Sequence, residues 1–238
     1  MSVVFRGFFF LIIFHAKMLA QHTVPKHLFH VHYAGAAGNH EIRNKTKYIN
    51  KLGSTYSFQI NNFSLGIDYH FLFGYYQGID LFQSLRTSEG MLISDNGSLI
   101  NTETYFRGNQ LHIIGGKMFP ANSLTSFQFN IGLGFLHHFL HITTLDGKMA
   151  YLSKNNLKGY DQLSFGPSLL QELRINHFGE KQRINYYIQL FAQEAFMQNL
   201  RKYNYFEASA DTKTHFNFIF GLQVGWLIPL FNQNDTVF

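Results

Sequence analysis

The feature that most constrains the fold is the stretch HFNFIFGLQVGWLIPLF at residues 215–231. Apolar side chains recur there at every second position, in the order Phe216, Phe218, Phe220, Leu222, Val224, Trp226 and Ile228. A period of two is the signature of a β-strand, because successive side chains point to opposite faces. The stretch is also shorter than the roughly 20 apolar residues that a membrane helix needs. It therefore predicts a long strand with one wholly apolar face.

The composition indicates what that apolar face meets. Aromatic residues make up 17% of the chain and charged residues only 14%, whereas soluble domains carry about 25% charged residues. Apolar residues interleaved with Asn, Gln, Ser, Thr and Gly are typical of a β-barrel that is apolar outside and polar inside. Cysteine is absent, which excludes disulfides and thiolate metal sites.

The N-terminus has the layout of an export signal. Arg6 precedes the apolar run GFFFLIIF, and AKMLA-QH then offers a cleavage point after Ala20. The sequence predicts a signal peptide at 1–20 and a barrel domain at 21–238. An uncleaved N-terminal anchor helix is the alternative.

Strand-like segments separated by turn residues fill the rest of the chain. The eight expected strands are 28–38, 63–71, 75–88, 101–119, 124–144, 162–177, 184–200 and 215–231. A start as early as residue 56 is an alternative for the second strand, with a register slip at Asn61-Asn62. Ten strands are the structural alternative, if 55–61 forms a strand of its own.

The lengths of the connections favour a membrane barrel. Short connections are expected at 72–74, 120–123 and 178–183, and long polar ones at about 39–55, 89–100, 145–161 and 201–214. Short turns on one side and long loops on the other are the outer-membrane pattern, with both termini in the periplasm. The predicted fold class is all-β, an eight-stranded antiparallel up-and-down transmembrane barrel.

The predicted lumen is narrow, because eight strands leave an interior that side chains just fill. Inward-facing charges then need partners. We expect them to form an ion-pair network of Asp68, Asp80, Arg86, Glu172 and Arg174.

Two groups of histidines have spacings that suit chemistry. His30 and His32 share a strand face, a spacing that suits a metal, but a polar lumen lining is the preferred interpretation, so no metal and no cofactor are expected. His141 and Thr143 lie near the outer end of one strand and resemble the His-x-Ser pair of lipid A deacylase barrels of the PagL type. That resemblance implies a histidine base and a hydroxyl nucleophile. Thr143 stands where that family has serine.

The net charge is +5, and much of the basic charge falls in the expected long loops. These outer-loop residues are Arg43, Lys45, Lys47, Lys51, Lys148, Lys154, Lys158, Arg201 and Lys202. In the predicted orientation they face lipopolysaccharide phosphates, and electrostatic contact is expected. Nucleic acid is not an expected partner of an exported barrel.

The runs Gly-Tyr-Asp-Gln-Leu-Ser-Phe-Gly-Pro-Ser at 159–168 and Phe-Gly-Leu-Gln-Val-Gly-Trp at 220–226 resemble those of small PorT-like outer-membrane barrels. The resemblance spans roughly 28–231 and implies a link to protein secretion. The sequence thus predicts a monomeric, non-enzymatic barrel in the outer membrane of a Gram-negative bacterium. It would act as a structural or accessory subunit of a secretion or membrane-assembly complex, in contact with lipids and other subunits. A lipid A hydrolase and a small-solute pore are the alternatives.

Overall fold

The structure is a computed structural model that describes residues 27–145, 154–179, 184–201, 203–206 and 208–230. The expected signal peptide at 1–20 lies outside the described residues. None of the helices in the described ranges is long and apolar enough to cross a membrane.

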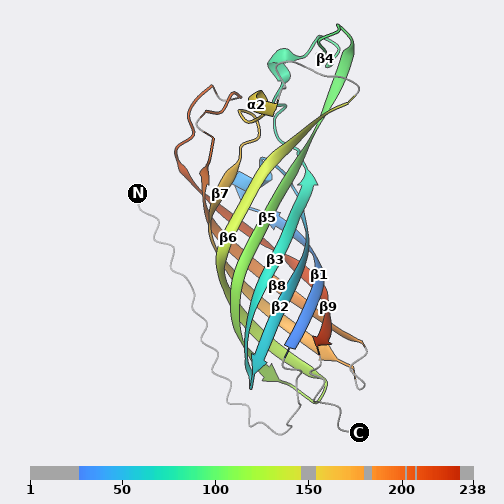
Figure 1. Cartoon of the computed structure of the whole chain (residues 1–238), viewed down its shortest axis with the longest axis vertical. Helices are drawn as coiled ribbons and strands as arrows, with labels where there is room; N and C mark the ends of the chain where they lie inside the picture. Colours follow the sequence, from blue (N-terminus) through green and yellow to red (C-terminus); the bar gives the residue numbers. More distant parts are fainter. Residues whose placement is uncertain (1–26, 146–153, 180–183, 202, 207, 231–238) are drawn as a thin grey trace.

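Eight antiparallel strands close into a barrel (Figure 1). They are β1 (His27–Gly38), β2 (Ile49–Ile60), β3 (Phe63–Tyr75), β5 (Leu99–Pro120), β6 (Thr125–Leu145), β7 (Ser164–Phe178), β8 (Asn185–Asn199) and β9 (Thr214–Leu230). Each strand pairs with the barrel strands before and after it in the sequence, and β9 pairs with β1 to close the barrel. β3 pairs directly with β5, because the short strand β4 (Leu92–Ile93) between them in the sequence lies outside the barrel wall and pairs only with β5. The predicted eight-stranded antiparallel fold is confirmed.

The two ends of the barrel differ as expected. At one end, β2 and β3 are joined through Asn61-Asn62, and β5 and β6 through 121–124. At the other end lie the connections 39–48 and 76–98 and the described residues 154–163, 200–201, 203–206 and 208–213 of two further connections; we call these residues the crown. The crown contains α1 (His40–Arg43), the 3-10 turn η1 (Gln83–Leu85), β4 and α2 (Lys154–Leu157). β5 and β6, with 22 and 21 residues, are twice the length that spans a bilayer, and they rise with β4 above the rest of the wall (Figure 1).

Two predicted segments differ from the structure, the one around β2 and the expected strand at 75–88. Residues 49–60 form a full strand, and the slip at Asn61-Asn62 is a tight turn in which Asn61 adopts a φ of 53°, a conformation that Asn tolerates. The expected strand at 75–88 and the expected turn at 72–74 are wrong, because β3 runs on to Tyr75 and a crown loop follows. Leu81 and Phe82 are adjacent and both buried, which a strand with one buried face does not allow.

The outer wall carries exposed apolar side chains on every barrel strand. Phe63, Leu65 and Ile67 on β3 are more than half exposed, as are Leu133 on β6 and Trp226 on β9. The side chains between them are small, polar or buried, which matches the burial alternation of each strand. A continuous exposed apolar wall around a polar interior is the architecture of a transmembrane barrel.

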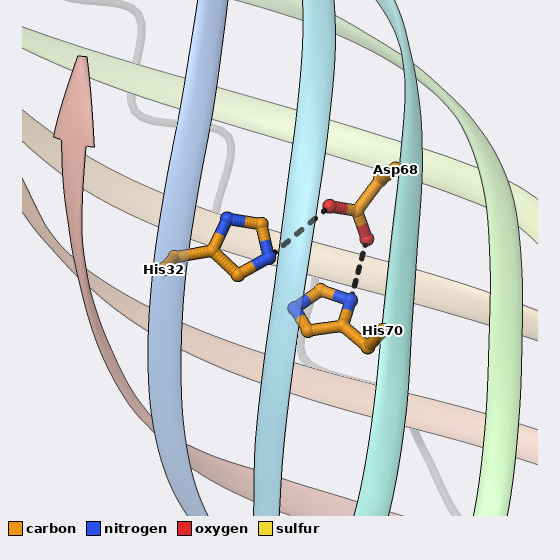
Figure 2. A group of neighbouring side chains, drawn as sticks. All are labelled: His32, Asp68 and His70. Atoms are coloured by element: carbon orange, nitrogen blue, oxygen red, sulfur yellow. Dashed lines mark ion pairs between the residues drawn. The ribbon is translucent and has the colours of Figure 1, made fainter.

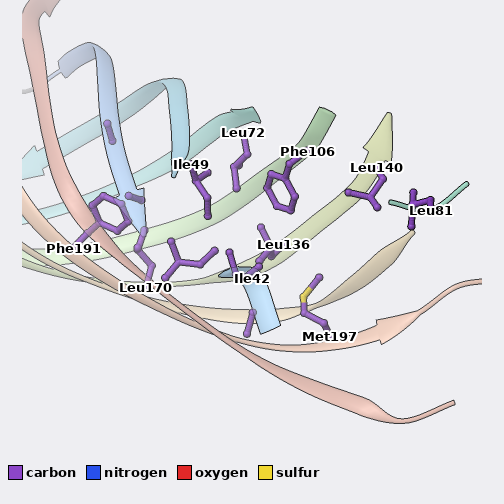
Figure 3. Packing of buried hydrophobic residues seen from close by; sticks show 14 of the residues in the cluster. Ile42, Ile49, Leu72, Leu81, Phe106, Leu136, Leu140, Leu170, Phe191 and Met197 are labelled. Atoms are coloured by element: carbon purple, nitrogen blue, oxygen red, sulfur yellow. The ribbon is translucent and has the colours of Figure 1, made fainter. Parts of the chain in front are cut away.

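The interior is layered along the barrel axis. Near the short turns, Leu28, Phe178, Tyr187 and Leu227 form a small apolar cap. Polar side chains fill the middle, and a larger apolar cluster fills the half next to the crown (Figure 3). That cluster includes Ile49, Leu72, Phe106, Leu136, Leu140, Leu170, Phe191 and Met197 from the wall, together with Ile42 and Leu81 from the crown. The crown and the lumen therefore share one hydrophobic core.

Candidate functional site

The buried ion pair of the lumen is Glu172 with Arg174. Both project inward from β7, and Arg174 Nη2 lies 3.4 Å from Glu172 Oε2. The carboxylate also accepts from Asn130 Nδ2 and Gln189 Nε2, each at 2.8 Å. Arg174 donates to Gln189 Oε1 at 2.7 Å, and its guanidinium lies 4.1 Å from the ring centre of Tyr187. Every charged atom here has a partner, as a buried pair requires.

Lys51 is a lumen residue, which corrects its expected place in an outer loop. It is 1% exposed on β2 and donates to Gln110 Oε1 and Gln193 Oε1, both at 3.0 Å. Its ammonium lies 4.3 Å from the ring centre of Phe191. The amides and the ring together stabilise a charge that burial would otherwise penalise.

Asp68 lies among histidines and is not joined to the Glu172–Arg174 pair. It accepts a hydrogen bond from Thr55 Oγ1 at 2.6 Å. His70 Nδ1 is 3.0 Å from its Oδ2, and His32 Nε2 is 3.8 Å from its Oδ1. The three side chains come from β1 and β3, on either side of Gly53 in β2.

Asp80 and Arg86 pair with each other in the crown, which corrects their expected place in the lumen. Both belong to the 76–98 loop, and Arg86 also donates to Gly90 O at 2.8 Å. Partial burial works to raise the pKa of Asp80, but hydrogen bonds from Arg86 and from the Phe82 amide, with the charge of Arg86, hold that pKa below its ordinary value. Burial, and then the charge of Asp80, raise the pKa of Tyr76 to about 12. The predicted network is thus three separate groups.

A cavity of about 570 Å³ opens at the crown end, with Glu41, Arg43, Tyr76, His138, Asp211 and His215 among its lining residues. His215 bridges two loops, since its Nε2 lies 3.0 Å from Asp211 and its Nδ1 lies 3.6 Å from Glu41. Asn217 and His138 form a buried amide–imidazole bond of 3.0 Å at the floor. The cavity has both charge signs, and its lining includes the polar pair His138 and Asn217 together with Met197 of the apolar cluster.

The predicted outer-loop basic residues divide into several groups. Arg43, Lys47 and Lys158 are exposed in the crown, and Lys45 is half-buried there. Arg201 pairs with Asp161, with Nε 2.8 Å from Oδ1. Lys148 and Lys202 lie outside the described residues, as does the side chain of Lys154. Three exposed cations therefore remain as candidate contacts for an anionic surface.

His141 and Thr143 lie on the outward face of β6, with His141 exposed. Across the strand pair they face Tyr105 and Glu103, and Tyr105 donates to the Glu103 carboxylate. No hydrogen bond joins His141 to Thr143 within the described part of the chain. The two residues of the pair expected from the deacylase resemblance are near in space, but the imidazole of His141 is not hydrogen-bonded to the hydroxyl of Thr143.

Sequence reasoning missed Lys51, Gln110 and Gln193 as members of the polar interior. A pattern in the sequence could have placed Lys51, because the apolar residues Leu52, Tyr56 and Ile60 all have even numbers and form the exposed wall side of β2. The spacing places Lys51 and Thr55 on the opposite, inner face. The cross-barrel contacts of the glutamines depend on closure of the barrel, which no local pattern reports.

Comparison with known proteins found no matching family model and no matching curated protein. Among solved structures, Neisserial surface protein A superposes with a TM-score of 0.48 at 9% identity, over 86% of this chain and 97% of that chain. Ail of Yersinia pestis gives 0.40 at 9%, covering 86% and 99%, and the outer membrane protein OprG of Pseudomonas aeruginosa gives 0.36 at 10%, covering 87% and 97%. At such distance these similarities say nothing of ligand, partner or activity. The PorT-like resemblance stays a prediction.

Proposed function

We propose that the chain is a non-enzymatic barrel of the Gram-negative outer membrane. In this proposal it serves as an accessory subunit whose crown binds another subunit of a secretion or membrane-assembly complex. The observation that carries the proposal is the crown itself, whose buried apolar side chains continue the core of the lumen. The apolar wall supports the location, because an exposed apolar surface of this extent is stable only against lipid.

The filled interior favours a scaffold over a pore. Apolar side chains occupy the lumen next to the crown, and paired polar groups occupy the middle. A small-solute pore is the alternative function, and it predicts conductance steps in planar bilayers. We expect a silent bilayer, because most of the side chains that block the lumen belong to barrel strands.

The crown combines a rigid base with exposed apolar side chains. Leu81, Phe82 and Leu92 are buried within it, while Ile79 and Ile93 are 65% and 49% exposed. Ordered loops that present apolar residues to water are common at protein interfaces. Arg43, Lys47 and Lys158 add positive charge, which suits the phosphates of lipopolysaccharide around the barrel.

A lipid A hydrolase is the other alternative, with His141 and Thr143 as base and nucleophile. Loss of lipid A deacylation on Thr143→Ala would support it. We expect lipid A to be unchanged in that variant and in a deletion strain, because the pair is not hydrogen-bonded and Glu103 is already bound by Tyr105.

The test is a mild-detergent pull-down of the tagged protein from its native outer membrane, with mass spectrometry of the associated proteins. The double variant Ile79→Ser/Ile93→Ser removes exposed apolar area from the crown, and Gln83→Ser/Ser88→Ala is the matched control on the same loop. We expect a stoichiometric partner with wild type and control and its loss from the double variant. Recovery of the barrel alone in every case would overturn the proposal.

A further inference from the structure

The buried cluster of His32, Asp68 and His70 has the composition and shape of a metal site. One ligand atom from each residue can be chosen so that all lie within 4.8 Å of one another (Figure 2). All three side chains are buried, and their rings and carboxylate point toward one another from β1 and β3. Two imidazoles and one carboxylate are a usual donor set for Zn²⁺ and its first-row neighbours.

A chain of hydrogen bonds fixes which atom of His70 carries a proton. Lys51 has only donors, so Gln110 must present its oxygen to Lys51 and its amide nitrogen to His70 Nδ1, which is 2.9 Å away. His70 Nδ1 is then an acceptor, and Nε2 donates to Gln223 Oε1 at 3.1 Å. Gln223 in turn donates to Tyr187 Oη at 2.7 Å. His70 Nδ1 therefore has no proton to donate to Asp68.

Asp68 and His32 both have buried polar atoms that lack hydrogen-bond partners among the described residues. Asp68 Oδ2 lies 3.0 Å from His70 Nδ1 and has no hydrogen-bond partner among the described residues. Neither ring nitrogen of His32 has one either, although the side chain is 2% exposed. Unsatisfied buried acceptors are costly, and a bound cation would satisfy both His32 and Asp68.

The backbone leaves room for this arrangement at Gly53. A Cβ atom at that position would lie 2.4 Å from His32 Nε2 and 2.7 Å from His70 Cδ2. Gly53 pairs with His32 on one side and with His70 on the other. Its missing side chain lets the two rings approach to a centroid distance of 4.4 Å.

From this geometry we propose that the lumen binds one divalent transition-metal ion, best matched by Zn²⁺, through His32, Asp68 and His70. Tetrahedral Zn²⁺ with bonds of about 2.0–2.1 Å places its ligand atoms about 3.3 Å apart. The separations of 3.0 Å from His70 Nδ1 to Asp68 Oδ2 and of 3.8 Å from His32 Nε2 to Asp68 Oδ1 lie on either side of that value, and one ligand atom from each residue lies within 4.8 Å of the others. Thr55 donates to the carboxylate and Gln223 accepts from His70 Nε2, and these contacts orient the ligands as outer partners do in zinc sites. The ion would take the lone pair that Gln110 now uses.

The ion must be loaded during folding, because the apolar cap and the apolar cluster close the lumen on both sides. The test is refolding from urea into detergent with Zn²⁺ present, without a polyhistidine tag, followed by a chelator wash and elemental analysis. Variants His32→Gln and His70→Gln remove ligands. His30→Gln is the matched control, because His30 lies on the same inner face and bonds Ser57 and Arg174 instead.

We expect about one chelator-resistant zinc ion per folded wild-type and His30→Gln chain, and at least about tenfold less in the two ligand variants. Heat-modifiable gel migration shows whether each variant has folded. If a ligand variant fails to fold, Co²⁺ refolding of wild type decides, since tetrahedral nitrogen and oxygen ligation gives visible absorption. Wild type without bound metal, or metal that persists without His32 and His70, would overturn the proposal.

Discussion

Replacing Arg174 by Met should destabilise the barrel strongly. The substitution keeps much of the side-chain volume but removes the guanidinium that contacts Glu172, Gln189 and His30. Glu172 is 2% exposed and would keep only the two neutral amide donors. Breaking one partner of a buried ion pair costs about 3–5 kcal/mol, because the other charge stays buried and uncompensated.

The double variant Glu172→Gln/Arg174→Met tests whether that cost comes from the charge. A glutamine at 172 retains an acceptor for Asn130, and no buried charge is left in this group. We therefore expect the double variant to be more stable than Arg174→Met alone, with a coupling of about 1–3 kcal/mol.

Urea titrations in detergent micelles measure both effects. Trp226 is the single tryptophan and lies on the outer wall, 58% exposed, so its fluorescence reports loss of the folded barrel, and gel migration without boiling gives a second probe. A free energy of unfolding for Arg174→Met within about 0.5 kcal/mol of wild type would refute the reasoning, as would additive effects of the two substitutions.

Two further predictions concern the wall and the crown. Gly53→Ala should lower the free energy of unfolding by about 1–3 kcal/mol, because the new Cβ would lie 2.4 Å from Tyr69 O. Gly35→Ala, with nothing within 4 Å, is the control and should change it little, so equal urea midpoints would contradict this explanation. In the crown, the lowered pKa of Asp80 means that its stabilising contribution is present above the ordinary value of 3.8 and is lost as pH falls through the folded-state pKa. Hydrogen exchange at the Phe82 amide, which donates to Asp80 Oδ1, should therefore speed up below about pH 4 after correction for intrinsic rates, and protection unchanged down to pH 2 would refute this.

The wall was predictable from sequence because one period-two pattern decides it. Leu133, Trp226 and their neighbours alternate with small or polar residues, and lipid admits no other arrangement. The first half of β2 was missed, and its second half was weighed only as an alternative, because the inner face of β2 carries Lys51, Gly53 and Thr55, which are also common in loops. The loop at 75–88 looked like a strand because Ile79, Leu81 and Leu85 are spaced at even intervals.

The lumen was only partly predictable, for a physical reason. Glu172 and Arg174 are two residues apart on one strand, so local spacing brings them to one face. Asp68 was expected to need a cation, yet its neighbours His32 and His70 depend on pairing of β1, β2 and β3 in a definite register. Asp80 and Arg86 pair in a loop whose path is set by the burial of Leu81 and Phe82.

Labelling of single cysteines would test the central claim, a transmembrane barrel with its crown outside the cell. The chain has no cysteine, so Ile79→Cys, Leu133→Cys and Ser123→Cys each give one reactive site, in the crown, on the wall and in a short turn. With a membrane-impermeant maleimide, we predict labelling of Ile79→Cys in intact cells, of Ser123→Cys only after the outer membrane is permeabilised, and of Leu133→Cys only after unfolding. Labelling of Leu133→Cys in the folded protein as fast as Ile79→Cys would contradict a lipid-facing wall, and labelling of Ser123→Cys in intact cells would contradict the orientation.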